Sequence, residues 1–338
     1  MTLAVNIAQS GSSNVTFRNR IINGAMVIDQ RNAGASSVPA TSSYTYTSLD
    51  RYFTSVNSPA TSTAIQSTTV PTGFSYSLKI GRSGTGTAGL NTFGQVIETN
   101  NSQDLAGSSV TLSFWAKVGA SATFSTMSAT IYSGTVANQT ASTLRSGWTG
   151  QATVATNASV ALTTTWQQFS ITGAVGSTAL QLAVQFVFTT VGTAGADDNL
   201  YITGVQLEAG TTATPFEYRQ YGTELALCQR YYEKSFAQGT APALNQSYQL
   251  TIGCNYLGAN ILIPTVQFKV IKRAAPTMTF YGVSNSGWRY YAGGWQNLSS
   301  FGGSAMDSYF SAEGSSTSGL SQYQSAIIGG NWTAEIEL

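Results

Sequence analysis

Apolar and polar residues alternate along most of the first 210 positions of the chain. Segments such as TLSFWAKV (111–118) alternate apolar with polar side chains, whereas LQLAVQFVFTT (180–190) is apolar along much of its length. The first pattern predicts a strand with one solvent face, and the second a strand covered on both faces. Runs of turn formers such as GRSGTGTAG separate these segments. We therefore predict an antiparallel two-sheet sandwich of jelly-roll type, with strands at residues 50–56, 75–80, 93–98, 109–118, 129–132, 167–172, 180–189 and 200–207.

A second β-rich region follows residue 234. In VQFKVI, Val266, Phe268 and Val270 share one face, opposite Gln267 and Lys269. No segment repeats at a period of about 20–50 residues, which argues against a propeller or a β-helix. The region predicts a second sandwich, with strands at 248–254, 265–271, 277–281, 287–292, 324–328 and 332–337. The chain thus divides into an arm at 1–18, a jelly-roll sandwich at 19–210, a linker with a short helix at 211–234 and a second sandwich at 235–338.

The linker carries the only clear helical pattern. Thr223 suits the N-cap, and Glu224 in the first turn suits the helix dipole. One face of the helix would then be formed by positions spaced i, i+3, i+4 and i+7, namely Leu225, Cys228, Gln229 and Tyr232. Because so short a helix is marginal alone in water, this face must pack on a neighbour. We interpret Cys228 and Cys254 as two buried thiols, since two cysteines form no disulfide framework in a chain of this length.

The charged residues exclude several classes of function. The chain has no histidine, and its 15 basic and 14 acidic residues make up only 9% of the sequence. Catalytic triads and zinc sites therefore lack their usual ligand and base. A net charge of +1 gives no basic face for nucleic acid and no polybasic patch for a membrane. No apolar run reaches the roughly 18 residues that a membrane span needs, and we expect neither nucleic-acid binding nor membrane insertion.

Three dispersed motifs resemble those of tailed-bacteriophage and prophage structural proteins. They are NRIINGAMVIDQRNAG (19–34), YTSLDRYF (46–53) and VQLEAGTTATPFEYRQYGTELALCQRYYEK (205–234). The resemblance implies a tail fibre or receptor-binding appendage, located in the virion and made in host cytoplasm. It also implies a homo-oligomer, by default a trimer, that contacts other virion structural proteins and attaches to the host surface. A capsid-decorating or head-fibre position remains an alternative.

The first β-rich region also resembles the galactose-binding-like jelly roll of carbohydrate-binding modules. The matching positions are Trp115, Lys117, Trp166, Phe169, Asp197 and Asp198. On physical grounds we expect the two tryptophans to anchor the sheet core rather than to contact sugar. Such sandwiches often hold a structural cation, so the resemblance implies a possible Ca²⁺ site formed by Asn23, Asp29, Asp197 and Asp198. A solvated turn is the alternative for these four residues.

A glycine-rich stretch in the second region concentrates aromatic residues. GWRYYAGGWQNLSSFGG supplies ring faces for stacking and polar groups for hydroxyls, both of which a neutral saccharide requires. The candidate glycan contacts are Trp288, Arg289, Tyr290, Tyr291, Trp295 and Asn297. The same residue types are also enriched in subunit interfaces and cores, which is the alternative interpretation.

These observations predict a non-enzymatic virion protein that binds host-surface glycan. A glycan depolymerase is the alternative, because a glycosidase needs only two suitably spaced carboxylates. With 14 acidic residues, several of them explained by strands or by the helix, we predict no catalytic residues and no cofactor apart from the possible Ca²⁺.

Overall fold

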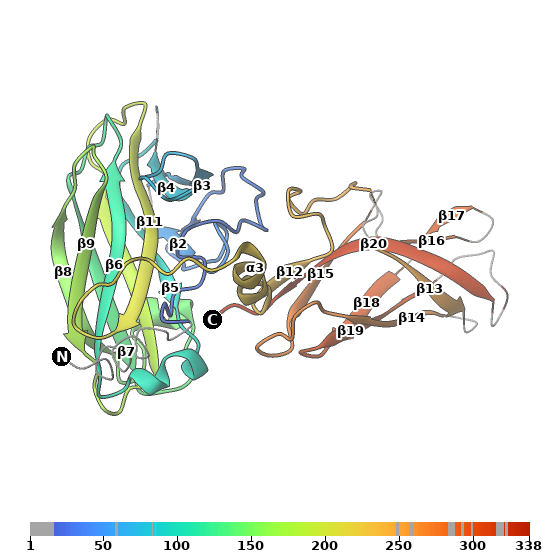
Figure 1. The fold of residues 1–338 in the computed structure, drawn as a ribbon. Coiled ribbons are helices and arrows are strands. Elements are labelled where there is room, and N and C mark those ends of the chain that lie inside the picture. The colour runs from blue at the N-terminus through green and yellow to red at the C-terminus, as the bar shows by residue number, and fades with distance from the viewer. Residues whose placement is uncertain are drawn as a thin grey trace, which may run out of the picture.

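The computed structural model is built almost entirely of β-strands, as the alternating pattern predicted. It describes residues 17–57, 60–82, 84, 86–247, 250–256, 260–282, 288–291, 294–298, 300–315, 321 and 324–338. Nearly all of the predicted N-terminal arm lies outside these residues. Figure 1 shows two β-rich units side by side, with helix α3 (Tyr221–Gln229) and the C-terminus between them.

The first unit is a sandwich of two sheets. Among the described residues, one sheet has six strands in the order β1-β2-β5-β10-β7-β8, antiparallel except for the β1–β2 pair. The other has five antiparallel strands in the order β3-β4-β11-β6-β9. The first sheet contains β1 (Ala40–Thr41), β2 (Phe53–Val56), β5 (Leu90–Val96), β7 (Thr126–Gly134), β8 (Ala152–Ala161) and β10 (Gln181–Thr189). The second contains β3 (Thr63–Ser67), β4 (Ser77–Arg82), β6 (Ser109–Val118), β9 (Gln167–Ala174) and β11 (Asp198–Ala209).

The core of the first unit lies between these two sheets. On β6, Leu112, Phe114 and Ala116 are fully buried, and they alternate with residues on the outer face. The Phe114 ring lies 5.0 Å from that of Phe186 on β10, which in turn lies 5.0 Å from that of Phe93. The alternation in the sequence places Phe114 on the inner face of β6, where it contacts the opposite sheet. This contact confirms the predicted sandwich.

Short helices in the loops of the first unit were not predicted. They are two 3₁₀ turns, η1 (Thr99–Asn101) and η2 (Gln103–Leu105), and helix α2 (Ala141–Ser146). Thr140 and Thr143 form a capping box on α2, with reciprocal side-chain to backbone hydrogen bonds. Two threonines therefore start this helix, a combination weaker as a sequence signal than the usual Ser/Thr with Glu/Gln.

Helix α3 begins three residues earlier than predicted, so the assignment of Thr223 as its N-cap was wrong. The N-cap is Gln220, without a side-chain capping bond, and Glu224 N donates to Gln220 O at 3.0 Å. Arg219 fixes this start, because its guanidinium binds both the Ile21 carbonyl and the Glu224 carboxylate. Cys228 and Gln229 are buried as predicted, whereas Tyr232 belongs to a strand and not to the helical face.

The second unit is one nine-stranded sheet, counted over the described residues. Its order is β17-β16-β20-β13-β14-β19-β18, and β12 and β15 pair with the other end of β20. Trp288, Tyr290 and Phe310 are buried in its core. The strands are β12 (Tyr232–Lys234), β13 (Leu250–Tyr256), β14 (Asn260–Gln267), β15 (Thr277–Tyr281), β16 (Arg289–Tyr291), β17 (Trp295–Asn297), β18 (Ser300–Ala305), β19 (Tyr309–Ser315) and β20 (Ser325–Glu335).

One long strand, β20, replaces the two short strands predicted near the C-terminus. The chain runs straight through Gly329 and Gly330, which lie between the two predicted strands. The ring of Trp288 packs so closely over Gly330 that a Cβ there would collide with it. The glycine therefore makes room for a core tryptophan rather than ending a strand. Figure 1 shows β20 running along the second unit and back to α3.

Both cysteines are buried thiols, as predicted. Cys228 lies in the cluster under α3 and Cys254 in the core of the second unit. Among the helices of the described residues, none combines the length and apolarity that crossing a bilayer requires.

Candidate functional site

A strap formed by residues 211–219 crosses the outer face of the five-stranded sheet. Gln206 and Glu208 lie on that face of β11, fully buried beneath the strap. Glu208 accepts hydrogen bonds from the Thr214 amide at 2.9 Å and from its hydroxyl at 2.6 Å. Gln206 accepts one from the Glu217 amide at 2.8 Å. The polar residues of VQLE…TPFE therefore fix the strap to the sheet.

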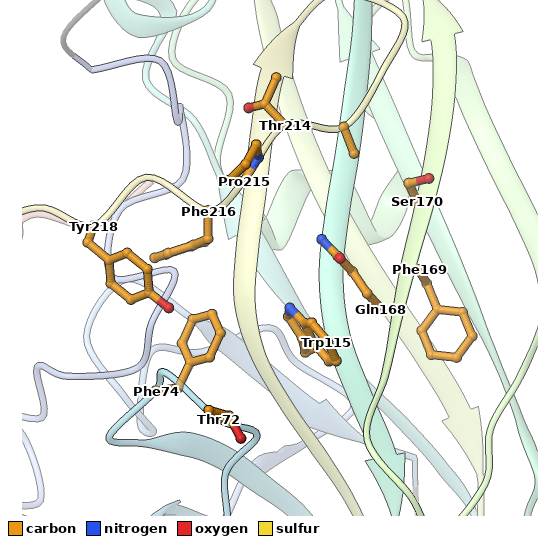
Figure 2. Close-up of a pocket in the computed structure, with 11 residues that line it drawn as sticks. Thr72, Phe74, Trp115, Gln168, Phe169, Ser170, Thr214, Pro215, Phe216 and Tyr218 are labelled. Carbon is orange, nitrogen blue, oxygen red and sulfur yellow. The ribbon is translucent and has the colours of Figure 1, made fainter.

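The strap and the sheet enclose an aromatic cleft of about 590 Å³. We use the name aromatic cleft for the hollow walled by Phe74, Trp115, Phe216 and Tyr218, with Gln168 and Ser170 on β9 (Figure 2). The ring of Phe74 lies 5.2 Å from that of Phe216 and 5.4 Å from that of Tyr218. Figure 2 shows Trp115 between this ring cluster and the Gln168 side chain. The cleft therefore presents aromatic surface beside amide and hydroxyl groups.

Gly204 makes room for the two rings at the base of the cleft. It has φ +63° and sits where the pairing of β11 with β6 shifts register between Thr203 and Gln206. A Cβ on Gly204 would lie 2.7 Å from Cζ of Phe74 and 3.0 Å from Cδ1 of Trp115. A glycine is thus required by both the backbone conformation and the close approach of the rings.

The prediction that Trp115 anchors the core was wrong. Trp115 is half-buried and lies on the outer face of β6, because its neighbours Phe114 and Ala116 take the inward positions. Trp166 is also half-buried, in the loop before β9. The alternation in TLSFWAKV contained this signal, since an inward Phe114 requires an outward Trp115. The prediction for Trp115 failed because it relied on the residue type and not on the position in the strand.

The cleft suits a neutral ligand. Of the described side chains that line it, only Tyr218 can titrate, and partial burial raises its pKa further above neutrality. Glu208 and Glu217 lie nearby, but they bind the strap and the N-terminal residues Arg18 and Asn19. Ring faces with amide and hydroxyl groups at their edge can stack on an apolar ligand face and hydrogen-bond its hydroxyls.

The structure divides the glycan contacts predicted in the second unit. Trp288 and Tyr290 are buried in the core at 1% and 0% exposure, so they offer no surface to a ligand. Arg289 is half-buried and donates to the Trp295 carbonyl at 3.1 Å. Tyr291 is 44% exposed, with its ring 5.6 Å from that of the half-buried Trp295. Asn297 is exposed. Glycan binding by these outer residues stays a prediction.

Each candidate calcium ligand is held by its own protein partners. The Asn23 amide bonds the Ile28 backbone and the Asp50 carbonyl, and Asp29 accepts from the Asn32 and Gly34 amides. Asp198 pairs with Arg82 at 2.7 Å and also accepts from Thr123. Hydrogen bonds from Tyr201 and Asn199 outweigh partial burial and lower the pKa of Asp197. Among the described residues, no three acidic or cysteine side chains gather as a metal would require.

Several other acidic residues build the contact between the two units, which we call the joint. Glu337 pairs with Arg31 and Arg51, and Glu98 accepts from Arg230 at 2.7 Å and from the Tyr231 hydroxyl at 2.8 Å. These bonds lower the pKa of Glu98 although burial raises it. The Arg51 guanidinium lies 3.5 Å from the centre of the Tyr231 ring. The NRIINGAMVIDQRN, LDRYF and CQRYYEK motifs thus meet here, a clustering that their dispersed positions did not reveal.

Comparisons with known proteins give only distant similarities. No protein-family model matches the sequence, and no curated protein matches it significantly. The enzymatically active domain of bacteriophage CBA120 tailspike protein 4 is 15% identical with a TM-score of 0.32, over 57% of this chain and 22% of that one. The CBM22-1 xylan-binding domain from Paenibacillus barcinonensis Xyn10C is 13% identical with a TM-score of 0.30, over 54% of this chain and 99% of that one. This chain therefore spans about a fifth of the tailspike structure, and similarities of this size establish no shared activity.

Proposed function

We propose that this protein is a non-enzymatic structural component of a bacteriophage virion that attaches to neutral glycans of the host surface through the aromatic cleft. The observation that carries the binding role is the cleft itself, where Phe74, Trp115, Phe216 and Tyr218 stand beside an amide and hydroxyls. A tail fibre or receptor-binding appendage, assembled as a homotrimer with other virion proteins, is the context that the sequence motifs support.

The non-enzymatic part of the proposal is supported by the roles of the carboxylates. In the described part of the chain, Glu98, Glu337 and Asp198 are engaged with arginines, while Glu208 and Glu224 bind backbone amides. A glycosidase requires an acid and a second carboxylate that both face the scissile bond. We expect no new reducing ends when the protein is incubated with host polysaccharide, and their appearance would support the depolymerase alternative.

The cleft is tested by Trp115→Ala, with Trp166→Ala as a matched control. Both tryptophans are half-buried on the first unit, but only Trp115 lines the cleft. Loss of the Trp115 stacking surface should weaken binding to host cells by about fivefold or more, since a stacked ring contributes about 1 kcal/mol or more. Adsorption of fluorescently labelled protein to host cells measures the effect. Equal adsorption by the two variants would exclude the cleft as the attachment site.

A further inference from the structure

A second pocket of about 460 Å³ lies between the two units. We call it the junction pocket; residues before β2, including Arg31 and Thr45, form one wall, and residues of β12, β15 and β20 form the other. Neither unit contains the pocket alone. Its size falls within the roughly 300–1,000 Å³ typical of small-molecule sites.

The wall from the second unit is set by strand alternation. Phe280 and Trp332 pair across β15 and β20 and point into the core. The alternate residues therefore face the first unit, and Thr279, which pairs with Thr333, lines the pocket. Tyr281 and Tyr232 add ring surface with hydroxyl groups at the edge.

The wall from the first unit contains polar atoms without hydrogen-bond partners. Arg31 stacks 3.9 Å from the Tyr232 ring centre, and its two terminal nitrogens bind Glu335 and Glu337 at 3.0 Å each. Within the described residues, the Arg31 Nε atom and the Thr45 hydroxyl are both buried and have no partner. A buried polar atom without a partner is unfavourable, and both atoms belong to side chains that line the pocket, so a ligand that reached them would be favoured by pairing them.

The chemistry of the lining favours a neutral ligand rich in hydroxyls. The Arg31 charge is already matched by two carboxylates, so the described residues that line the pocket offer no free cation to an anionic ligand. The hydroxyls of Thr45, Thr47, Thr279 and Thr333 can each donate and accept. Ser37 and Asn32 also line the pocket, but the Ser37 hydroxyl already donates to the Ala64 carbonyl and the Asn32 amide to the Thr47 and Ser48 carbonyls. Threonine hydroxyls, which donate and accept, match a molecule whose own hydroxyls do both.

We propose that the junction pocket binds a neutral, polyhydroxylated ligand of one or two sugar rings, held by both units at once. This site is separate from the aromatic cleft, and it goes beyond the attachment role proposed above. A ligand bound here contacts residues separated by about 300 positions in the sequence, Arg31 and Glu335 among them. Its binding should therefore stabilise the joint, because it favours the arrangement in which the two walls face each other.

The test compares Thr279→Trp with Thr277→Trp in the full-length protein. Both positions are exposed on β15, but only Thr279 lines the pocket, so only the first substitution fills it. Calorimetric titration with lactose, maltose, cellobiose and sucrose gives the readout. We expect the Thr277→Trp variant to bind at least one of these sugars. The Thr279→Trp variant should bind that sugar at least about tenfold more weakly. Equal behaviour of the two variants toward all four sugars overturns the proposal.

Two further variants keep the result interpretable. Thr45→Val removes the unpartnered hydroxyl while keeping the branched shape, so it should weaken binding of the same sugar even if Thr279→Trp fails to fold. If Thr45→Val binds that sugar as the wild type does, the pocket is not the site. Trp115→Ala should keep this binding while losing adsorption to host cells, which separates a failure of the junction pocket from a failure of the cleft.

Discussion

Neighbouring residues of one strand serve opposite purposes in this protein. Phe114 contacts the facing sheet, and Trp115 forms a wall of the cleft on the other side of β6. Nothing in the chemistry of the two side chains distinguishes these roles, since both are large aromatic groups. The direction of the Cα–Cβ bond decides, and that direction follows from counting along the strand.

Gly204 provides a test of the cleft at a single residue. Gly204→Ala should lower the free energy of unfolding by about 1–3 kcal/mol, because alanine is strained at positive φ. Its methyl group would also press on Phe74 and Trp115, so binding to host cells should fall. Gly210→Ala is the control, since Gly210 also has positive φ but a Cβ there meets nothing within 4 Å. Denaturant titration and adsorption measure the two effects, and similar loss of adsorption in both variants would contradict the role given to Gly204.

At the residue scale, the sequence predicted the burial and position of individual side chains better than the residues that they contact. The buried thiol of Cys228 and the place of Glu224 in the first turn of α3 follow from residue type and spacing. The use of the Glu224 carboxylate does not, because its partners Asn23 and Arg219 come from two different segments. Trp288 was likewise predicted to contact glycan at the surface, but it is buried in the core of the second unit. Its ring packs over Gly330, where the absence of a side chain leaves room for it.

Elements were predicted well where one physical pattern dominated. Strand 109–118 coincides with β6 and strand 277–281 with β15, because polar and apolar residues alternate along most of each. Predictions failed where a tertiary contact overrode the local signal. Arg219 moved the start of α3, and the packing of Trp288 on Gly330 carried β20 through a glycine pair. The cleft itself could not be predicted, because it needs the strap and the bulge at Gly204 to meet.

Strand β12 carries a buried lysine whose protonation should be visible in stability. Lys234 is fully buried and donates to the carbonyls of Gln30, Gln238 and Thr240 at 2.7–3.0 Å. Burial lowers its pKa to about 8, although the nearby carboxylates of Asp50 and Asp29 raise it and Lys269 lowers it further. Below pH 8 the folded state must bury the charge. Above pH 8 the folded state loses this proton before the unfolded state does, so stability gained from Lys234 increases toward pH 10.5.

Comparison of the wild type with Lys234→Met isolates this effect. The difference in unfolding free energy between them should shift in favour of the wild type as pH rises from about 8 to about 10, since only the wild type gains from deprotonation. Denaturant titrations at pH 7, 8.5 and 9.5 provide the measurement. A difference that stays constant over this range, or moves the other way, would contradict the role of Lys234.

The whole molecule depends on contacts between residues that are far apart in the chain. Glu337 meets Arg51 across 286 positions, and the carbonyl of Leu338 accepts from the Tyr46 hydroxyl and the Ala141 amide. Two β-rich regions and a helix between them were predictable from periodicity. Their mutual arrangement was not, because ion pairs between dispersed motifs leave no periodic trace in the sequence.

The joint makes a prediction for cooperative unfolding. The Glu337 side chain is 5% exposed and pairs with two arginines. The substitution Glu337→Gln therefore leaves the positive charge of Arg51 buried without a carboxylate to neutralise it. We expect the free energy of unfolding to fall by about 3–5 kcal/mol. We also expect two separate thermal transitions where the wild type shows one. Glu335→Gln is the control, because Glu335 is 46% exposed and its pair should contribute about 1 kcal/mol or less. Scanning calorimetry measures both, and a single unshifted transition in Glu337→Gln would mean that the units are coupled by other contacts.

Strand β20 has a mechanical consequence. It bonds to β13 and β16 along one half and to β12 and β15 along the other, and its end continues into the joint. Backbone hydrogen bonds lie across an antiparallel strand, so tension along its axis loads these bonds together in shear instead of opening them one by one. Under the attachment role proposed above, a force applied along β20 would act in the direction in which the second sheet resists best.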